Sequence, residues 1–270
     1  MAKTVVEGRP PWTGRADPRA GLATKDVTGH DAGRRAGPRR GVVLVDLDDT
    51  LVPDVAARDT AMRSVLSLFG ARADLDAVWS VVREEWHASR LGPAPALAGV
   101  SSWEALWTDL PAALRHDQGA VRGQGFQTRT WRRLLPGVDP SQASAAFRRA
   151  REGVTRPYAW VGPALAEWTT THQLWCATNG SSWLQRRKLQ LAGLEEAFSD
   201  VVVSGEVGAV KADPRFSTTV RARLGRAGAV PVAVVGDSPA SDGALAAALG
   251  VPHVRVVPGE RPVESWTRSA

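Results

Sequence analysis

Short, continuous apolar runs recur along the chain and predict the strands of a buried sheet. The first run covers residues 41–46, and similar runs follow at 174–178, 201–204, 231–236 and 253–257. Apolar runs of this β-branched type are typical of strands in a parallel sheet that is covered on both faces.

Helical periodicity fills the intervals between the later strands. We expect helices over residues 181–191, 214–224 and 241–249, and Pro214 suits the first turn of its helix. Because strands and helices alternate, the chain predicts an α/β fold with a doubly wound parallel sheet.

About a hundred residues between the first and second strands break this rhythm. They show helical periodicity without a convincing strand, which predicts an inserted all-α cap domain at 56–158. The α/β core would then comprise residues 41–55 and 159–270. The helices expected in the insert cover residues 55–69, 75–91, 102–114, 128–135 and 141–154, with loops at 92–95 and 122–125.

The charge of the chain is concentrated near its start. Residues 1–40 hold nine Lys or Arg residues and four Asp or Glu residues, so they carry five of the six net positive charges. This segment is rich in Gly, Pro and Arg and has little apolar periodicity, which predicts a disordered basic tail. It contains no recognisable nucleic-acid-binding module, so nucleic acid is not the favoured partner.

The single cysteine, Cys176, excludes an intramolecular disulfide and a zinc site built from cysteines. It falls within an expected strand, so we interpret it as a core thiol. The chain has no evident secretory signal and no apolar run of about 18 residues, so we expect a cytoplasmic location without membrane association. The sequence does not indicate an oligomeric state.

Polar side chains gather at the predicted carboxyl ends of the strands, where open parallel sheets bind ligands. Carboxylates that converge there would repel one another unless a divalent cation shared them, and their hard oxygen atoms suit Mg²⁺. Magnesium would also allow an anionic carboxylate to approach an anionic phosphate ester. The residues that end or follow the strands are Asp46, Asp48, Thr178, Asn179, Lys211, Asp237 and Asp242.

These residues resemble the four motifs of the haloacid dehalogenase superfamily in their order and approximate spacing. The resemblance covers residues 41–257 and rests on Asp46-Leu47-Asp48, Thr178-Asn179-Gly180, Lys211 and Gly236-Asp237-Ser238 with Asp242. It implies a Rossmann-like core, a helical cap, and a magnesium-dependent phosphatase that forms an aspartyl-phosphate.

The resemblance also implies a role for each aspartate. Asp46 would be the nucleophile and a Mg²⁺ ligand. Asp48 would act as general acid and then as general base, with its backbone carbonyl on the metal. Asp237 would complete the metal site, and Asp242 would lie in its outer shell. We therefore expect the side chains of Asp46, Asp48 and Asp237 to meet around one ion.

The remaining motif residues are expected to bind the transferring phosphoryl group. Thr178 and the amides around Asn179 would hold its oxygen atoms, and Lys211 would compensate the charge of Asp46 and the phosphate. The family usually has proline directly after the motif lysine, whereas this chain has Ala212, so the loop around Lys211 is expected to be looser.

The aspartate at position 48 helps to distinguish among the reactions that different branches of the superfamily catalyse. The dehalogenase branch lacks an aspartate at this position, and the phosphonate-cleaving branch needs a cap lysine, which residues 56–158 do not contain. A sugar-phosphate mutase shares the Asp-x-Asp pair and stays an alternative, as does a catalytically idle member that binds a phosphorylated ligand. Residues 178–180, 185–189 and 204–208 look most similar to nucleotide and acyl-sugar phosphatases, which suggests a small phosphorylated metabolite.

Other conspicuous residues are given structural interpretations. The basic run of Arg186, Arg187 and Lys188 is interpreted as a solvated helix face, and Asp49 and Asp54 as turn residues. We expect the tryptophans of the insert to be packed in its core, because two of them are spaced four residues apart on a helix.

Overall fold

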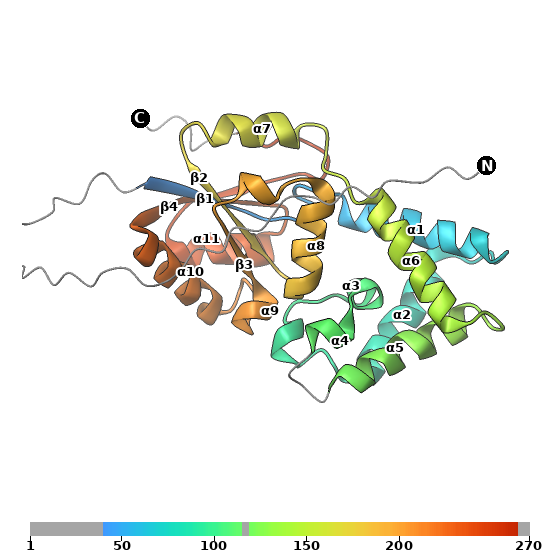
Figure 1. Ribbon diagram of the computed structural model, residues 1–270. Coiled ribbons are helices and arrows are strands. Elements are labelled where there is room, and N and C mark those ends of the chain that lie inside the picture. Colours follow the sequence, from blue (N-terminus) through green and yellow to red (C-terminus); the bar gives the residue numbers. More distant parts are fainter. Residues whose placement is uncertain (1–39, 115–118, 264–270) are drawn as a thin grey trace, which may run out of the picture. The chain divides into compact units, whose positions relative to one another are not determined.

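The computed structural model describes residues 40–114 and 119–263, and these residues form one compact unit around a parallel sheet (Figure 1). All paired strands are parallel, so their carboxyl ends share one edge. The predicted α/β fold with a doubly wound sheet is confirmed. In the order β3-β2-β1-β4-β5, the strands are β1 (Arg40–Val45), β2 (Gln173–Thr178), β3 (Asp200–Val203), β4 (Ala229–Gly236) and β5 (His253–Arg255).

The central strand β1 is buried on both faces because its side chains alternate between two apolar layers. Val43 and Val45 pack in one layer, and Val42 and Leu44 pack in the other. The first layer contains residues of α7 (Val161–Trp168) and α8 (Ser182–Ala192), and the second contains residues of α10 (Pro214–Ala227) and α11 (Ala244–Leu249). The short elements α9 (Ser204–Val207), η2 (Glu195–Ala197) and η3 (Pro239–Gly243) complete this part of the chain.

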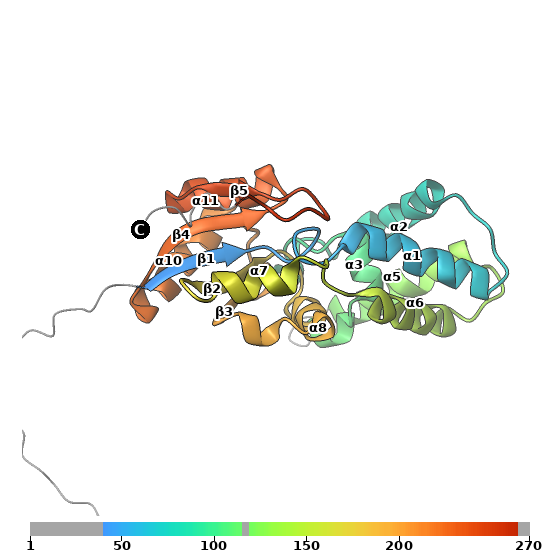
Figure 2. The ribbon, with the colours of Figure 1, turned by 90° about the horizontal axis from the view of Figure 1, so that it is seen from above.

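Between β1 and α7 the described residues form helices joined by loops and contain no named strand, in agreement with the expected helical insert. This helical segment lies on the side of the sheet towards which the strands point (Figure 2). Its first helix begins at Asp54, two residues before the predicted start of the insert. The segment consists of α1 (Asp54–Leu68), α2 (Leu75–Ser89), η1 (Pro95–Leu97), α3 (Ser102–Trp107), α4 (Leu110–Ala113), α5 (Gly119–Leu134) and α6 (Pro140–Val154).

Three helices differ from the sequence prediction. The helix expected at 102–114 is divided, because Asp109 caps the new helix α4 and Pro111 lies in its first turn, where its missing N–H costs least. Helix α5 includes the loop expected at 122–125, although glycine usually weakens a helix. Helix α7 was not predicted, and it contains Gly162 and Pro163, residue types that usually disfavour a helix.

The tryptophans of the insert follow the predicted packing with one exception. Trp79, Trp86, Trp107 and Trp131 are buried in the apolar core of the helical segment. Trp103 is only partly buried, and its indole N–H donates to Asp54 Oδ2 at 2.9 Å. This side chain therefore links the packed interior of the insert to polar groups.

Other sequence expectations concern location and the termini. Cys176 lies buried in β2, and burial raises the pKa of its thiol, as expected for a core residue. Among the described residues, no helix combines the length and apolar character needed to cross a bilayer. The cytoplasmic location stays a prediction. The segment predicted to be a disordered tail, residues 1–40, lies outside the described residues except for Arg40.

A close backbone contact joins the helical segment to the strand ends at α9. A Cβ atom on Gly205 would lie 2.6 Å from the carbonyl oxygen of Ala96 and 2.8 Å from that of Gly180. The preceding hydroxyl, Ser204 Oγ, donates to the carbonyl of Ala98 at 2.5 Å and accepts the N–H of Gly180 at 2.8 Å. Glycine at 205 is therefore required for this approach.

We expect Gly205→Ala to lower the free energy of unfolding by about 1–3 kcal/mol, because the added methyl group meets backbone atoms that cannot rotate away. Urea unfolding followed by circular dichroism measures the change. Gly225→Ala in α10 is the matched control, since nothing lies within 4 Å of its Cβ position. The control should be neutral or stabilise by about 0.5–1 kcal/mol. Equal stabilities for the two variants would contradict the inferred contact.

Candidate active site

A cavity of about 390 Å³ lies at the carboxyl edge of the sheet. Residues of the helical segment line it together with residues that end or follow the strands. From the segment come Asp54, Gly99, Ser101, Trp103 and Glu104. From the strand ends come Asp46, Asp48, Asp49, Thr178, Asn179, Lys211, Asp237, Ser238 and Ser241. All predicted site residues except Asp242 therefore line one cavity.

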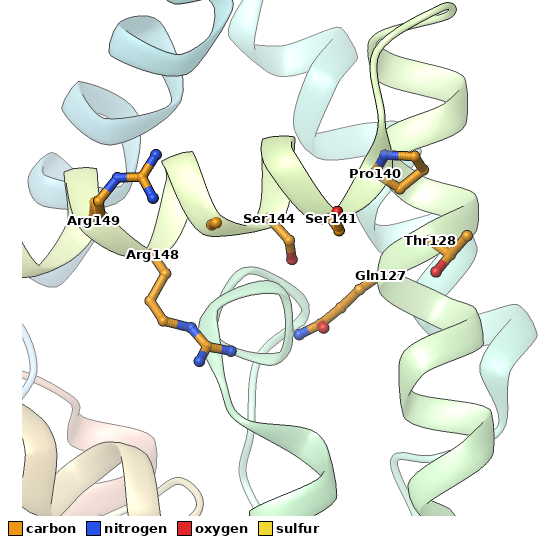
Figure 3. A pocket seen from close by; sticks show the side chains of 8 residues that line it. Gln127, Thr128, Pro140, Ser141, Ser144, Arg148 and Arg149 are labelled. Carbon is orange, nitrogen blue, oxygen red and sulfur yellow. The ribbon is translucent and has the colours of Figure 1, made fainter.

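A second hollow, of about 510 Å³, lies between the middle of α5 and the first three turns of α6 (Figure 3). Its lining contains no acidic side chain and no predicted site residue. The residues that line it are Gln127, Thr128, Pro140, Ser141, Ser144, Ala145, Arg148 and Arg149. The acidic cavity is therefore the candidate active site.

Lys211 joins two of the predicted aspartates. Its Nζ lies 2.5 Å from Asp46 Oδ1 and 2.5 Å from Asp242 Oδ1. Its backbone N–H donates to Asn179 Oδ1 at 2.9 Å, which fixes the loop that carries the lysine. The loop with Ala212 thus brings Lys211 to Asp46, while the expectation of a looser loop stays a prediction.

Asp237 is linked to Asp46 through the hydroxyl group of Thr50. The hydroxyl Thr50 Oγ1 lies 3.2 Å from Asp46 Oδ2 and 3.4 Å from Asp237 Oδ1, and it accepts the N–H of Asp237 at 3.0 Å. Asp46, Asp237 and Asp242 each offer an oxygen atom within 4.8 Å of the others. Three carboxylates this close could share one divalent cation.

Electrostatics support a cation at this position. Burial raises the pKa of Asp46 to about 6, although Lys211 opposes the shift and Asp242 adds to it. Burial and the charge of Asp46 raise the pKa of Asp237. The carboxylates therefore destabilise one another's charged form, and a bound divalent cation would relieve that repulsion.

Asp242, which is predicted to lie in the outer shell of the metal, contacts the site through Lys211 and does not itself line the cavity. It is fully buried and bonds Lys211 directly, and its Oδ2 accepts the N–H of Ser238 at 3.1 Å. A Cβ atom on Gly236 would lie 2.2 Å from Asp242 Oδ2. The glycine at the end of β4 therefore makes room for this carboxylate.

The carboxylate of Asp48 belongs to a different acidic group, with Asp54 and Glu104. This corrects the expectation that the side chains of Asp46, Asp48 and Asp237 meet around one ion. Strand β1 ends at Val45, so residues 46 and 48 lie beyond it, where the alternation of a strand no longer aims them to one side. The predicted metal contact of the Asp48 backbone carbonyl stays a prediction.

Lys188 occupies the centre of this second group. Its Nζ lies 2.7 Å from Asp48 Oδ1, 3.0 Å from Asp54 Oδ1 and 2.8 Å from Glu104 Oε1. Burial alone would lower the pKa of Lys188, but the three carboxylates raise it above its usual range. The ammonium group therefore takes the place that a metal ion would need.

The interpretation of residues 186–188 as a solvated face is wrong for Lys188. The side chains of Arg186 and Arg187 are 50% and 34% exposed, whereas that of Lys188 is 0% exposed. Lys188 follows the buried Leu184 by four residues and therefore lies on the buried face of α8. That spacing is the signal that could have identified it.

Asp54 and Asp48 differ in their affinity for a proton. Asp54 also contacts the buried guanidinium of Arg151, and together with Lys188 this cation holds the pKa of Asp54 well below its usual range, against the effect of burial. Burial raises the pKa of Asp48 well above its usual value, despite Lys188. Asp48 is therefore the carboxyl group of this pair that retains a proton more readily.

The predicted phosphate-binding residues lie at the end of β2 and just after it. Thr178 Oγ1 lies 3.2 Å from Gln185 Oε1. The side chain of Asn179 donates to Ser241 Oγ at 3.1 Å and accepts from the backbone of Lys211. The Asn179 side chain therefore braces two loops of the site.

Comparison with known proteins agrees with this architecture. The family model of the haloacid dehalogenase-like hydrolases matches residues 41–250. The chain is 35% identical over 233 residues to the phosphoserine phosphatase of Thermus thermophilus, which covers 82% of this chain and 90% of the relative. It is 27% identical over 173 residues to the pyrimidine 5′-nucleotidase YjjG of Escherichia coli, over 61% of this chain and 74% of the relative.

A solved structure shares the fold. The HAD hydrolase YfnB from Bacillus subtilis, bound to magnesium, matches with a TM-score of 0.56 and 18% identity, over 84% of this chain and 93% of that chain. A parallel sheet with an acidic cavity at its carboxyl edge is the arrangement in which α/β proteins bind their ligands. The chain belongs to the haloacid dehalogenase-like hydrolase family, which confirms the predicted membership and the prediction of an enzyme.

We expect Lys211→Met to lower the free energy of unfolding by about 3–5 kcal/mol in the presence of a chelator, because two buried carboxylates lose their cation. Urea denaturation measures the change. Arg215→Met is the control, since Arg215 pairs with Asp213 at the surface and its loss should leave the unfolding midpoint unchanged. Equal midpoints for the two variants would show that Lys211 does not compensate buried charge.

Proposed function

We propose that the protein is a magnesium-dependent phosphatase that uses Asp46 as its nucleophile. One observation carries the proposal. Asp46 directly follows the central strand, its Oδ1 contacts Lys211, and its Oδ2 contacts Thr50, whose hydroxyl also contacts Asp237. Asp46 and Asp237 belong to a group of carboxylates that could share a cation. A carboxylate in this position can attack phosphorus while nearby positive charge offsets the repulsion between the two anions.

The metal-binding residues in this proposal are Asp46 and Asp237, with the backbone carbonyl of Asp48 as predicted from the family. Bound Mg²⁺ would neutralise the charge of the phosphate oxygens. Lys211 would compensate the negative charge of both Asp46 and the phosphoryl group. Thr178 and the amides around Asn179 would hold the phosphoryl oxygens.

The reaction would proceed in two transfers. Asp46 would form a bond to phosphorus as the bond to the leaving oxygen breaks, and the proton of Asp48 would go to that oxygen. In the second step Asp48 would accept a proton from water as the water oxygen displaces Asp46 from phosphorus. The raised pKa of Asp48 is consistent with a group that begins the cycle protonated.

The substrate is proposed to be a small phosphorylated metabolite, with O-phosphoserine as the first candidate. The relative from Thermus thermophilus is a phosphoserine phosphatase. A cavity of about 390 Å³ lies at the lower end of the range for small-molecule sites, which favours a small ester over a large one.

Residues 56–158 are proposed to act as a cap. Their Gly99, Ser101, Trp103 and Glu104 line the cavity opposite the strand ends. A cap in this position could exclude water while Asp46 attacks and readmit it for hydrolysis. The domain boundaries stay those predicted from the sequence.

Two alternatives make different predictions. A sugar-phosphate mutase would return the phosphoryl group to its sugar, whereas a phosphatase releases inorganic phosphate. A catalytically idle member would bind a phosphorylated ligand without turnover. The similarity to a phosphatase over most of the chain favours hydrolysis over both.

We expect Asp46→Asn to reduce phosphate release by several orders of magnitude, because an amide cannot form the aspartyl-phosphate. Steady-state kinetics with O-phosphoserine measures the loss. Asp76→Asn, an exposed position in the first turn of α2, is the matched control and should keep full activity. Substantial turnover by the Asp46 variant would exclude the proposed nucleophile.

We expect a chelator to abolish hydrolysis and added Mg²⁺ to restore it, because the acidic group cannot bind a phosphate ester without a cation. A panel of O-phosphoserine, a nucleoside 5′-monophosphate and glucose 1-phosphate would be assayed for inorganic phosphate and for glucose 6-phosphate. Glucose 6-phosphate without phosphate release would support the mutase instead. Full activity in the chelator would refute the metal requirement.

A further inference from the structure

We propose that Lys188 is a positioning residue for Asp48, and that Glu104 of the helical segment holds Lys188 in place when that segment covers the site. The inference rests on the proposed function, in which Asp48 transfers the proton. It adds two residues that the family motifs do not include, one from α8 and one from α3.

Both carboxylate oxygens of Asp48 are held by side chains of α8. Oδ1 accepts from Lys188 Nζ at 2.7 Å, and Oδ2 accepts from Gln185 Nε2 at 3.2 Å. Lys188 and Gln185 are both fully buried, three residues apart on one face of the helix. Together they restrict the direction in which Asp48 can present an oxygen to the cavity.

The same two donors share an acceptor on the helical segment. Glu104 Oε1 lies 2.8 Å from Lys188 Nζ and 2.9 Å from Gln185 Nε2. The second oxygen of Glu104 accepts the N–H of Ser101 at 3.0 Å and its hydroxyl at 2.9 Å. Glu104 is therefore fixed at both oxygens, and its place determines where Lys188 and Gln185 can lie.

The charge balance around Lys188 indicates that its contact with Asp48 is not needed to compensate the buried cations. Lys188 and Arg151 are two buried cations, and Asp54 and Glu104 would compensate them without a third carboxylate. The ammonium of Lys188 nevertheless also contacts Asp48, which faces the cavity. The geometry therefore connects a buried charge cluster to the side chain proposed to handle the proton.

The contact depends on the position of the helical segment. Asp48 and Lys188 belong to the predicted core, whereas Glu104 belongs to the predicted cap. A second ion pair, Arg187 Nη2 with Glu152 Oε1 at 3.0 Å, joins α8 to α6 but is partly exposed and does not touch Asp48. This second pair provides a matched control for the effect of joining the two regions.

The experiment compares two esters of similar size that differ in their need for a proton. When Asp46 bonds to phosphorus, the phosphorus–oxygen bond of the leaving group breaks. Benzyl alcoholate needs the proton of Asp48 on its oxygen, whereas p-nitrophenolate leaves as a stable anion. The value of kcat/KM reports the steps up to this first transfer. The ratio of kcat/KM for benzyl phosphate to kcat/KM for p-nitrophenyl phosphate therefore measures how far that transfer depends on the proton of Asp48.

We expect Lys188→Met to lower kcat/KM for benzyl phosphate about 100-fold, which is the lower range for loss of general acid catalysis. For p-nitrophenyl phosphate the fall should be less than about 5-fold, because that leaving group does not depend on the proton. Glu104→Gln should change the ratio in the same direction by a smaller factor. Arg187→Met should leave both values of kcat/KM within about 2-fold of the unaltered protein.

Glu104→Gln keeps the size of the side chain and the charge of Lys188, so it carries the test if Lys188→Met does not fold. An equal fall for both esters, or no fall for either, in a folded variant would overturn the positioning role and leave the phosphatase proposal intact. If the unaltered protein hydrolysed neither ester nor any member of the metabolite panel, both proposals would be overturned. A changed ratio in Arg187→Met would also contradict the specific role of Lys188.

Discussion

Compensation of buried negative charge is the constraint on which the site depends. Among the described residues, two groups of three carboxylates lie at the carboxyl edge of the sheet, and four of these six side chains are buried. Removing an uncompensated carboxylate from water is costly. Lys211 supplies a cation to the first group, and Lys188 and Arg151 supply cations to the second. The first group has one lysine for three carboxylates, and it therefore has the greater need of a further cation.

The two lysines connect different parts of the molecule. Lys211 and its carboxylate partners all follow strands of the sheet, so the first group is complete within the predicted core. Lys188 bonds Asp48 from the core and also Asp54 and Glu104, which belong to the helices α1 and α3. The first group is thus suited to bind phosphate and metal, and the second is suited to couple the helical segment to the strand ends.

The sequence predicted the parallel sheet and the carboxyl-edge residues well, because apolar runs and polar strand ends are local signals. It did not predict the direction of the Asp48 side chain, because this residue lies beyond the end of β1, where strand alternation does not apply. Nor did it predict the burial of Lys188, whose partners Glu104 and Asp48 lie 84 and 140 residues away in the chain. A run of basic residues predicts an exposed helix face when the distant carboxylates that pair with it are not known. The break at Pro111, by contrast, was a local signal that the helix prediction overlooked.

Glu104 has a second task, because it forms the capping box that begins α3 together with Ser101. Helix α3 has six residues, a length at which an isolated helix is not stable in water. The carboxylate that meets Lys188 therefore also determines whether this helix begins at Ser102. One carboxylate thus supports both the start of α3 and the contact with α8, so a substitution that removes it weakens the two together.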